Sequence, residues 1–149
     1  MILTKMQPSH IDGVKTLLDV CFGGNAWSRE SIAAQLDKDV SYCAVALDED
    51  QVVGYIAYEV ILDEGSLIEL AVMPEYRQKG IGRKLVELML TSCGGVRTVC
   101  LEVRASNTPA IRLYGSAGFR KISVRRDYYD SPKEDAVMMI YQMDKETNL

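Results

Sequence analysis

Two glycines flanked by basic residues form the stretch of this sequence with the clearest chemical capacity. Gly80 and Gly82 stand between Lys79 and Arg83, where a helical pattern begins. Glycine permits a tight turn and leaves room for a ligand, and the first amides of a helix have no partner within it. With the helix dipole, such amides bind anions, above all phosphate. The sequence therefore predicts a phosphate-binding loop, although it matches neither the P-loop nor the Gly-x-Gly-x-x-Gly pattern.

Two elements must hold this loop in place. Residues 66–72 are short and mostly apolar, which predicts a buried strand, and Pro74 ends it because proline cannot continue a ladder. The helix after the loop has one apolar face, formed by Ile81, Leu85, Leu88 and Met89. The alternative interpretation of this stretch is a plain strand–turn–helix corner without a ligand.

A second group of reactive side chains follows in the next strand and helix. Glu102 lies near the end of a predicted strand, and Tyr114 lies in the helix that follows. Each residue also has a structural interpretation. Glu102 could pair with Arg97 or Arg104, Tyr114 could belong to the core, and Asn107 could simply cap a helix.

Metal-centred and nucleophilic chemistry is not indicated. The single histidine, His10, comes at a predicted helix start, where histidine is typically a solvated surface residue, and it leaves no obvious Ser-His or Cys-His pair. The cysteines have no metal-ligand spacing and are expected to be reduced thiols serving as small apolar residues. They are Cys21, Cys43, Cys93 and Cys100.

Length and composition predict one soluble domain spanning residues 1–149. The chain is 48% hydrophobic and 26% charged, as in globular proteins. Its net charge of −4 and pI near 5.0 argue against nucleic acid as a direct partner and suit a basic peptide or amine substrate. There is no signal-peptide pattern and no apolar run long enough to span a bilayer, which predicts a cytoplasmic protein without a membrane partner.

Periodicity along the rest of the chain predicts the element order β-α-α-β-β-β-α-β-α-β-β. This order indicates an α/β fold with a mixed, mostly antiparallel sheet of about seven strands, flanked by four helices. Residues 127–135 are expected to form an acidic, tyrosine-bearing loop between the last two strands. The expected strands are 2–6, 42–47, 51–61, 66–72, 96–103, 119–124 and 136–143. The expected helices begin at Pro8, Arg29, Ile81 and Thr108.

The glycine loop resembles the acetyl-CoA pyrophosphate loop of the GNAT superfamily of N-acetyltransferases, whose pattern is Arg/Gln-x-x-Gly-x-Gly/Ala between an apolar strand and a helix. The element order is also that of the GNAT fold. Within the superfamily, residues 27–143 resemble the bacterial ribosomal-protein-alanine N-acetyltransferases (the RimI type). The segments that carry this resemblance are Ala26–Ser28, Leu101–Asn107, Leu113-Tyr114, Gly118-Phe119, Arg125-Arg126, Tyr128-Tyr129 and Glu134–Ala136.

This resemblance implies a function for particular positions. The expected reaction transfers acetyl from acetyl-CoA to an amine by direct attack in a ternary complex, with Glu102 as general base, Tyr114 as general acid and no metal. For these roles, partial shielding of Glu102 from water is expected to favour proton uptake, and the hydroxyl of Tyr114 can donate a proton. Arg77 opens the motif, and its side chain can brace the loop instead of touching the ligand. The positions implied to bind acetyl-CoA are Leu70, Ala71, Val72, Gln78, Lys79, Gly80, Ile81, Gly82, Arg83 and Asn107.

The resemblance also implies the acceptor, which is the N-terminal amine of a basic protein, most specifically the alanine of a small-subunit ribosomal protein. Trp27, Tyr128 and Tyr129 are expected to flank the peptide channel, although Trp27 could equally be a hydrophobic plug between two helices. The enzyme is expected to be a monomer or a weak dimer.

Glu69 departs from the RimI pattern, which usually has a small or amide side chain at this position. In other GNAT enzymes a carboxylate occurs here and can be the base. Glu69 could thus replace Glu102 as base, share the work through a water, or recognise a cationic substrate. Alternation along the strand does not decide between these roles. A bulge in the strand would turn the Glu69 side chain to the opposite face of the sheet.

Two other functions stay open at the level of the sequence. One is a GNAT acetyltransferase that acts on a lysine side chain or a small free amine. The other is a CoA-binding regulatory or scaffold module without turnover, although such a module would have no need of an acid and a base.

Overall fold

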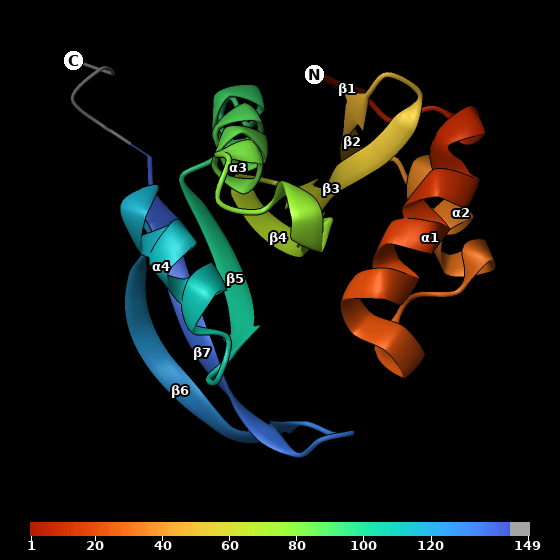
Figure 1. The fold of residues 1–149 in the computed structure, drawn as a ribbon. Coiled ribbons are helices and arrows are strands. Elements are labelled where there is room, and N and C mark those ends of the chain that lie inside the picture. The colour runs from red at the N-terminus through yellow and green to blue at the C-terminus, as the bar shows by residue number, and fades with distance from the viewer. Residues whose placement is uncertain (144–149) are drawn as a thin grey trace.

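The computed structural model describes residues 1–143, and within them seven strands and four helices follow one another in the predicted order (Figure 1). The strands are β1 (Ile2–Lys5), β2 (Ser41–Asp48), β3 (Gln51–Ile61), β4 (Glu64–Val72), β5 (Thr98–Arg104), β6 (Arg120–Tyr129) and β7 (Glu134–Gln142). The helices are α1 (Ile11–Phe22), α2 (Arg29–Asp37), α3 (Ile81–Ser92) and α4 (Thr108–Ser116). Short 3-10 turns cover Pro8–His10, Gly23–Asn25 and Pro74–Tyr76.

The predicted mixed sheet is confirmed. Its seven strands have the spatial order β1-β2-β3-β4-β5-β7-β6, and every neighbouring pair is antiparallel except β4 and β5. The parallel pair needs a crossover, which α3 supplies by returning the chain over one face of the sheet. The glycine loop therefore lies at the start of the crossover, next to the end of β4.

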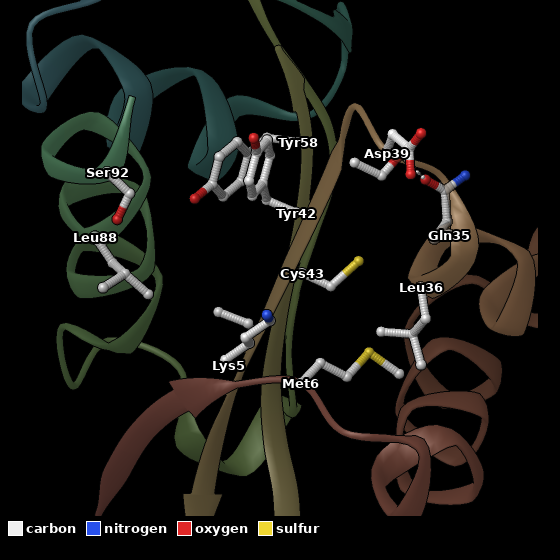
Figure 2. A pocket seen from close by; sticks show the side chains of 12 residues that line it. Lys5, Met6, Gln35, Leu36, Asp39, Tyr42, Cys43, Tyr58, Leu88 and Ser92 are labelled. Carbon is white, nitrogen blue, oxygen red and sulfur yellow. Dashed lines mark hydrogen bonds between the residues drawn. The ribbon is translucent and has the colours of Figure 1, made fainter. Parts of the chain in front are cut away.

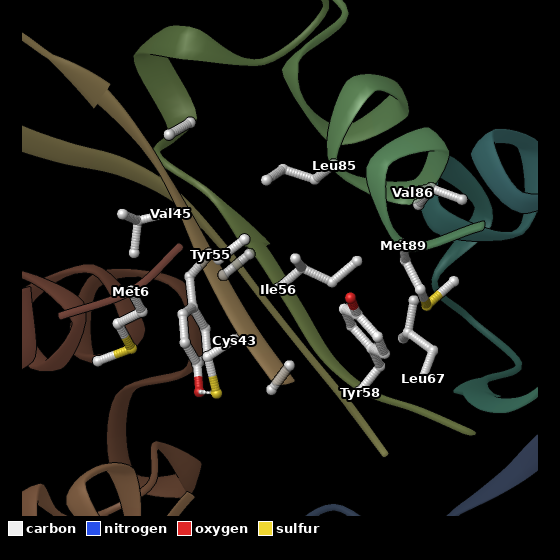
Figure 3. Packing of buried hydrophobic residues seen from close by; sticks show 14 of the residues in the cluster. Met6, Cys43, Val45, Tyr55, Ile56, Tyr58, Leu67, Leu85, Val86 and Met89 are labelled. Carbon is white, nitrogen blue, oxygen red and sulfur yellow. Dashed lines mark hydrogen bonds between the residues drawn. The ribbon is translucent and has the colours of Figure 1, made fainter. Parts of the chain in front are cut away.

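Helices cover both faces of the central strands. Helices α1 and α2 pack on one face, and α3 packs on the other beside α4 (Figure 1). Seven consecutive residues of β3, Val52–Tyr58, are buried as a result. Figure 3 shows the two layers of the core, with Tyr55 next to Met6 on one side and Ile56 facing Leu85 and Met89 on the other.

The predicted loop 127–135 is wrong in its extent. Strand β6 continues to Tyr129 and β7 begins at Glu134, so only residues 130–133 connect them. Tyrosine favours extended backbone, and Tyr129 pairs directly with Glu134 across the hairpin, which outweighs the loop signal of the acidic residues. Residues 130–133 are called the hairpin tip below.

A bulge in β4 sets the geometry of the functional region. Glu69 pairs with Ala57 and Leu67 pairs with Tyr58, so Ile68 is an extra residue between two regular ladders. Residues directly opposite in a ladder lie on the same face of the sheet. Glu69 therefore shares the face of Ala57 and Tyr55, which α1 covers, and not the face of Leu67.

Strands β4 and β5 diverge after a short paired segment. Their parallel ladder extends only from Glu64 opposite Thr98 to Ser66 opposite Cys100. Among the described residues, no strand pairs with the β5-facing edge of residues 67–72, although β3 pairs along the other edge. The divergence leaves a backbone edge of β4 open beside the glycine loop.

Candidate active site

The glycine loop has the backbone geometry of an anion site. Gly80, with φ of +82°, precedes the first residue of α3, and no side chain caps this helix. The helical hydrogen-bond ladder begins with the Lys84 amide, which donates to the Gly80 carbonyl over 3.0 Å. The amides of residues 81–83 thus have no helical acceptor. A Cβ at Gly80 would meet no atom within 4 Å, which leaves the space that a phosphate requires.

The two glycines have different surroundings. A Cβ at Gly82 would lie 2.8 Å from Cδ1 of Leu113, so this glycine lets α3 and α4 pack closely. Gly80 borders open space instead, and both glycines stay candidates for the ligand loop.

Arg77 braces the loop. Its Nε donates to the Val72 carbonyl over 3.0 Å, and a terminal nitrogen lies 3.5 Å from Sγ of Cys21. The predicted rim cations are also oriented by neighbours. Nζ of Lys79 lies 5.3 Å from the ring centroid of Tyr76, and Arg83 donates to the Ser116 hydroxyl over 3.2 Å.

Both candidate bases lie on the same face of the sheet. Ser66 is opposite Glu59 of β3, which shares its face of the sheet with Ala57, the partner of Glu69. Ser66 is also opposite Cys100 of β5, and Glu102, two residues further on, points to the same face. Arg97 pairs with Asp63 and Arg104 pairs with Glu134, so within the described residues neither arginine forms a salt bridge with Glu102. The structure thus does not support the interpretation of Glu102 as an ion-paired structural residue.

The two carboxylates differ in their surroundings. Glu102 is exposed, contrary to the expected partial shielding, because its side chain points away from the buried Leu101 and Val103. Glu69 is partly buried, and burial raises its pKa from 4.5 to about 7, although a hydrogen bond with the Leu70 backbone opposes the change. With this pKa, Glu69 can gain and lose a proton near neutral pH.

Three tyrosines belong to the same group of side chains as the two carboxylates. Tyr114 is only 5% exposed, and burial, followed by the negative charge of Glu69, raises its pKa above the ordinary value. Burial raises the pKa of Tyr129 to about 12, with a further contribution from the charge of Glu102. A hydrogen bond to Glu102 raises the pKa of Tyr128. Side chains from β4, β5, α4 and β6 therefore converge where β4 and β5 diverge.

The remaining predicted residues have structural contacts of their own. The Asn107 side chain accepts from the Ala110 amide over 3.3 Å, so it caps α4 as one interpretation expected. Trp27 is half-buried against the core at the end of the α1–α2 connection, and its carbonyl accepts from Lys15 over 2.9 Å. This packing agrees with a plug between helices and does not test a contact with substrate.

A separate hollow of about 470 Å³ lies at the open edge of β2, beyond the end of β1 (Figure 2). Tyr42 and Tyr58 line it on the side of α3, and Leu36 lines it on the side of α2. No residue that the sequence singled out for catalysis or binding contributes to its lining. The convergence of carboxylates and tyrosines, and not this hollow, is therefore the candidate active site.

Within residues 1–143, no three His, Cys, Asp or Glu side chains are grouped so that they could hold a metal ion. None of the helices described here is long and apolar enough to cross a membrane.

Comparison with known proteins agrees with this geometry. The model of the acetyltransferase (GNAT) family matches residues 11–119. The chain belongs to the GNAT family. It is an acetyl-CoA-dependent N-acetyltransferase, as the glycine loop and the reactive side chains led us to expect. A relative from Escherichia coli (strain K12), named ribosomal protein bS18-alanine N-acetyltransferase, is 37% identical over 118 residues, which are 76% of this chain and 78% of the relative.

Solved structures of GNAT proteins share the fold. The crystal structure of the Escherichia coli ribosomal-protein-S18-alanine N-acetyltransferase has a TM-score of 0.87 and 28% identity, and the match covers 96% of this chain and 94% of that one. Arabidopsis thaliana NAA60 in complex with acetyl-CoA has a TM-score of 0.83 at 17% identity, covering 95% and 98%. Structural neighbours in this family thus bind acetyl-CoA, and the uncapped start of α3 has the chemistry to hold its phosphates.

Sequence reasoning missed two residues that organise the site. Arg104 was considered only as a partner of Glu102, yet it contacts the hairpin tip. Asn25, between α1 and α2, was not singled out from the sequence, yet its side-chain amide donates to the Ser131 carbonyl over 2.8 Å. Neither contact has a sequence signal, because each joins segments that are distant along the chain.

Proposed function

We propose that this enzyme acetylates the N-terminal amine of a protein, most specifically the N-terminal alanine of a small-subunit ribosomal protein. The observation that carries the proposal is the 37% identity, over about three quarters of both chains, to an enzyme named for that reaction. A protein with this substrate would act in the cytoplasm on a basic N-terminus, which suits a chain of net charge −4.

In this proposal, the phosphates of acetyl-CoA bind the amides of residues 81–83, and the pantetheine arm lies along the open edge of β4. The gap between β4 and β5 then holds the thioester. Gly80 supports this arrangement because it leaves open space at the start of α3. The Met73 amide donates to the Val53 carbonyl of β3, so by alternation the backbone of Ala71 also faces β3. The Val72 carbonyl already accepts from Arg77, so the backbone of Leu70 and the amide of Val72 are the better candidates for contacts.

The reaction requires a neutral amine. An α-amino group has a pKa of about 8, so part of it is already neutral near pH 7 and only a weak general base is needed to remove the proton. Glu102 serves as base, acting through a water because its carboxylate is exposed. Tyr114 serves as acid: its raised pKa keeps the hydroxyl protonated at neutral pH, where it can donate to the departing thiolate. Trp27, Tyr128 and Tyr129 flank the acceptor channel.

Glu69 supports an alternative assignment within the same fold. Its pKa of about 7 suits a general base at neutral pH, and its carboxylate could also attract a cationic lysine side chain or a small free amine. The alternative function is therefore acetylation of such an amine, with Glu69 as base or as recognition residue.

The test compares CoA release from acetyl-CoA with a short basic peptide that begins with alanine and with its N-blocked form. The variants are Glu102→Gln and Glu69→Gln, and Glu64→Gln is the matched control because Glu64 is an exposed carboxylate of the same strand as Glu69. Loss of a general base costs about 10²–10⁴-fold in rate. We expect this loss in Glu102→Gln with the free peptide, and none in the control.

The other outcomes separate the alternatives. Loss of turnover only in Glu69→Gln would move the base to β4. Turnover of the N-blocked peptide through its lysines would favour side-chain acetylation. No release of CoA with any peptide, although acetyl-CoA binds, would retain the fold and the co-substrate but reject the substrate.

A further inference from the structure

Arg104 contacts the β6–β7 hairpin at several points. This last residue of β5 donates through Nη1 to the Pro132 carbonyl over 2.8 Å and through Nη2 to the Asp130 carbonyl over 3.4 Å. Its guanidinium carbon also lies 4.4 Å from the ring centroid of Tyr129. One side chain thus binds two carbonyls of the hairpin tip and contacts the aromatic residue that precedes it.

An acidic neighbour fixes the orientation of Arg104. Oε1 of Glu134 accepts from Nη1 over 3.3 Å, while Oε2 accepts from the Ser106 amide over 2.7 Å. The hydrogen bonds from Ser106, followed by Arg104, lower the pKa of Glu134, which keeps this carboxylate charged at neutral pH. Arg104 and Glu134 are 28% and 19% exposed in their side chains, so water competes only partly for these contacts.

The hairpin tip is also fastened from the opposite side. Asn25, between α1 and α2, donates to the Ser131 carbonyl over 2.8 Å. The α1–α2 connection and the hairpin tip therefore meet on the face of the sheet that holds both candidate bases. The Tyr129 ring lies 5.1 Å from that of Tyr128, and after burial the charges of Glu102 and Glu69 contribute to its raised pKa.

We propose that Arg104 is a positioning residue for the acceptor, which holds the hairpin tip and Tyr129 in the place that the acceptor peptide requires. This inference rests on the proposed function, because it assigns the region between Asn25 and Tyr129 to the peptide. Arg104 acts on acceptor binding and leaves the acetyl-CoA loop unaffected, since that loop lies at the start of α3.

Lysine cannot replace arginine in this arrangement. The planar guanidinium donates in two directions at once and stacks on an aromatic ring, whereas an ammonium group is a single point charge. The two carbonyls of the hairpin tip and the Tyr129 ring together need the guanidinium geometry.

The experiment measures steady-state kinetics of Arg104→Met and Arg104→Lys, varying the peptide and acetyl-CoA separately. Arg97→Met is the matched control, because Arg97 is a 68% exposed arginine just before β5 that pairs with Asp63. We expect the KM for the peptide to rise about tenfold or more in both Arg104 variants, as for other lost charged hydrogen bonds. The KM for acetyl-CoA and the control should stay within about twofold of wild type.

Hydrogen exchange of residues 127–135 provides a second measurement that needs no turnover. In Arg104→Met, the amides of this segment should exchange faster than in wild type or in Arg97→Met, while those of α3 stay unchanged. Unchanged exchange would overturn the proposal whatever the substrate is. Faster exchange with an unchanged KM for the peptide would also overturn it, because the contact would then be structural only. Absence of turnover in wild type would instead reject the proposed substrate, and with it the acceptor role.

Discussion

Two glutamates on the same face of the sheet have opposite surroundings. Glu102 extends into solvent from β5, whereas the bulge turns Glu69 toward the covered face of β4. The charge of a partly buried carboxylate is destabilised, which explains a pKa near 7 for Glu69. The bulge thus gives Glu69 a pKa in the folded protein that differs from the ordinary value of a glutamate.

This difference makes stability depend on pH. The folded-state pKa of Glu69 is raised, so its contribution is fully present below pH 4.5 and is lost as the pH rises to about 7. Glu69→Gln should therefore match wild type in free energy of unfolding near pH 4 and exceed it above pH 7. The limit is on the order of 3–4 kcal/mol, at about 1.4 kcal/mol per pKa unit.

Urea unfolding at pH 4.5, 6 and 8 would measure this difference, with Glu64→Gln as the control for removal of an exposed carboxylate from β4. A constant difference between Glu69→Gln and wild type across these pH values would contradict the assignment of Glu69 as the titrating group.

At the scale of elements, one extra residue shapes the active site. Ile68 interrupts the β3–β4 ladder, and a bulge bends its strand and increases the local twist. The β4–β5 ladder ends at Ser66, immediately before this bend. The bulge thus accounts both for the face of the sheet to which the Glu69 side chain points and for the open edge of β4.

Deletion of Ile68 tests this account. Ala57–Glu69 and Tyr58–Leu67 would become consecutive regular pairs, so the sheet should form but β4 should run straighter beside β5. We expect the far-UV circular dichroism to be retained and the affinity for acetyl-CoA, measured by calorimetry, to fall by about tenfold or more.

The control is Ile68→Val, which keeps the extra residue and only trims a side chain that is 37% exposed. It should bind acetyl-CoA as wild type does. If the deletion also bound normally, the divergence of β4 from β5 would not depend on the bulge.

At the scale of the whole molecule, charge favours one class of acceptor. The chain has 21 acidic and 17 basic residues, and a net negative protein attracts a cationic peptide over a distance set by the ionic strength. This attraction increases the rate at which enzyme and peptide associate and leaves the chemical step unchanged. It should therefore be detected as a dependence of kcat/KM on salt concentration.

We expect kcat/KM for a basic alanine-starting peptide to fall by several-fold between 0.02 and 0.3 M salt, as the screening length shrinks from about 20 Å to below 8 Å. A peptide with the same first residues but glutamine in place of lysine and arginine should show little change. Equal salt dependence for the two peptides would mean that the charge of the acceptor does not contribute to encounter.

Much of the fold followed from local patterns. The glycine loop, its flanking strand and helix, and the alternation of apolar residues predicted the element order and the mixed sheet, because each depends on neighbours along the chain. The loop 127–135 was the exception, since the pairing of Tyr129 with Glu134 is a contact between strands.

The chemistry of this protein was therefore determined by sequence, and its arrangement by tertiary structure. The anion loop was predicted from residue type and spacing, and Glu102 and Tyr114 were singled out by resemblance to the GNAT family. The facing of Glu69, its raised pKa and the contacts of Arg104 with the hairpin tip required the folded sheet. The physical reason is that burial and long-range hydrogen bonds depend on segments that meet only after folding, as Asn25 and Ser131 do from 106 positions apart.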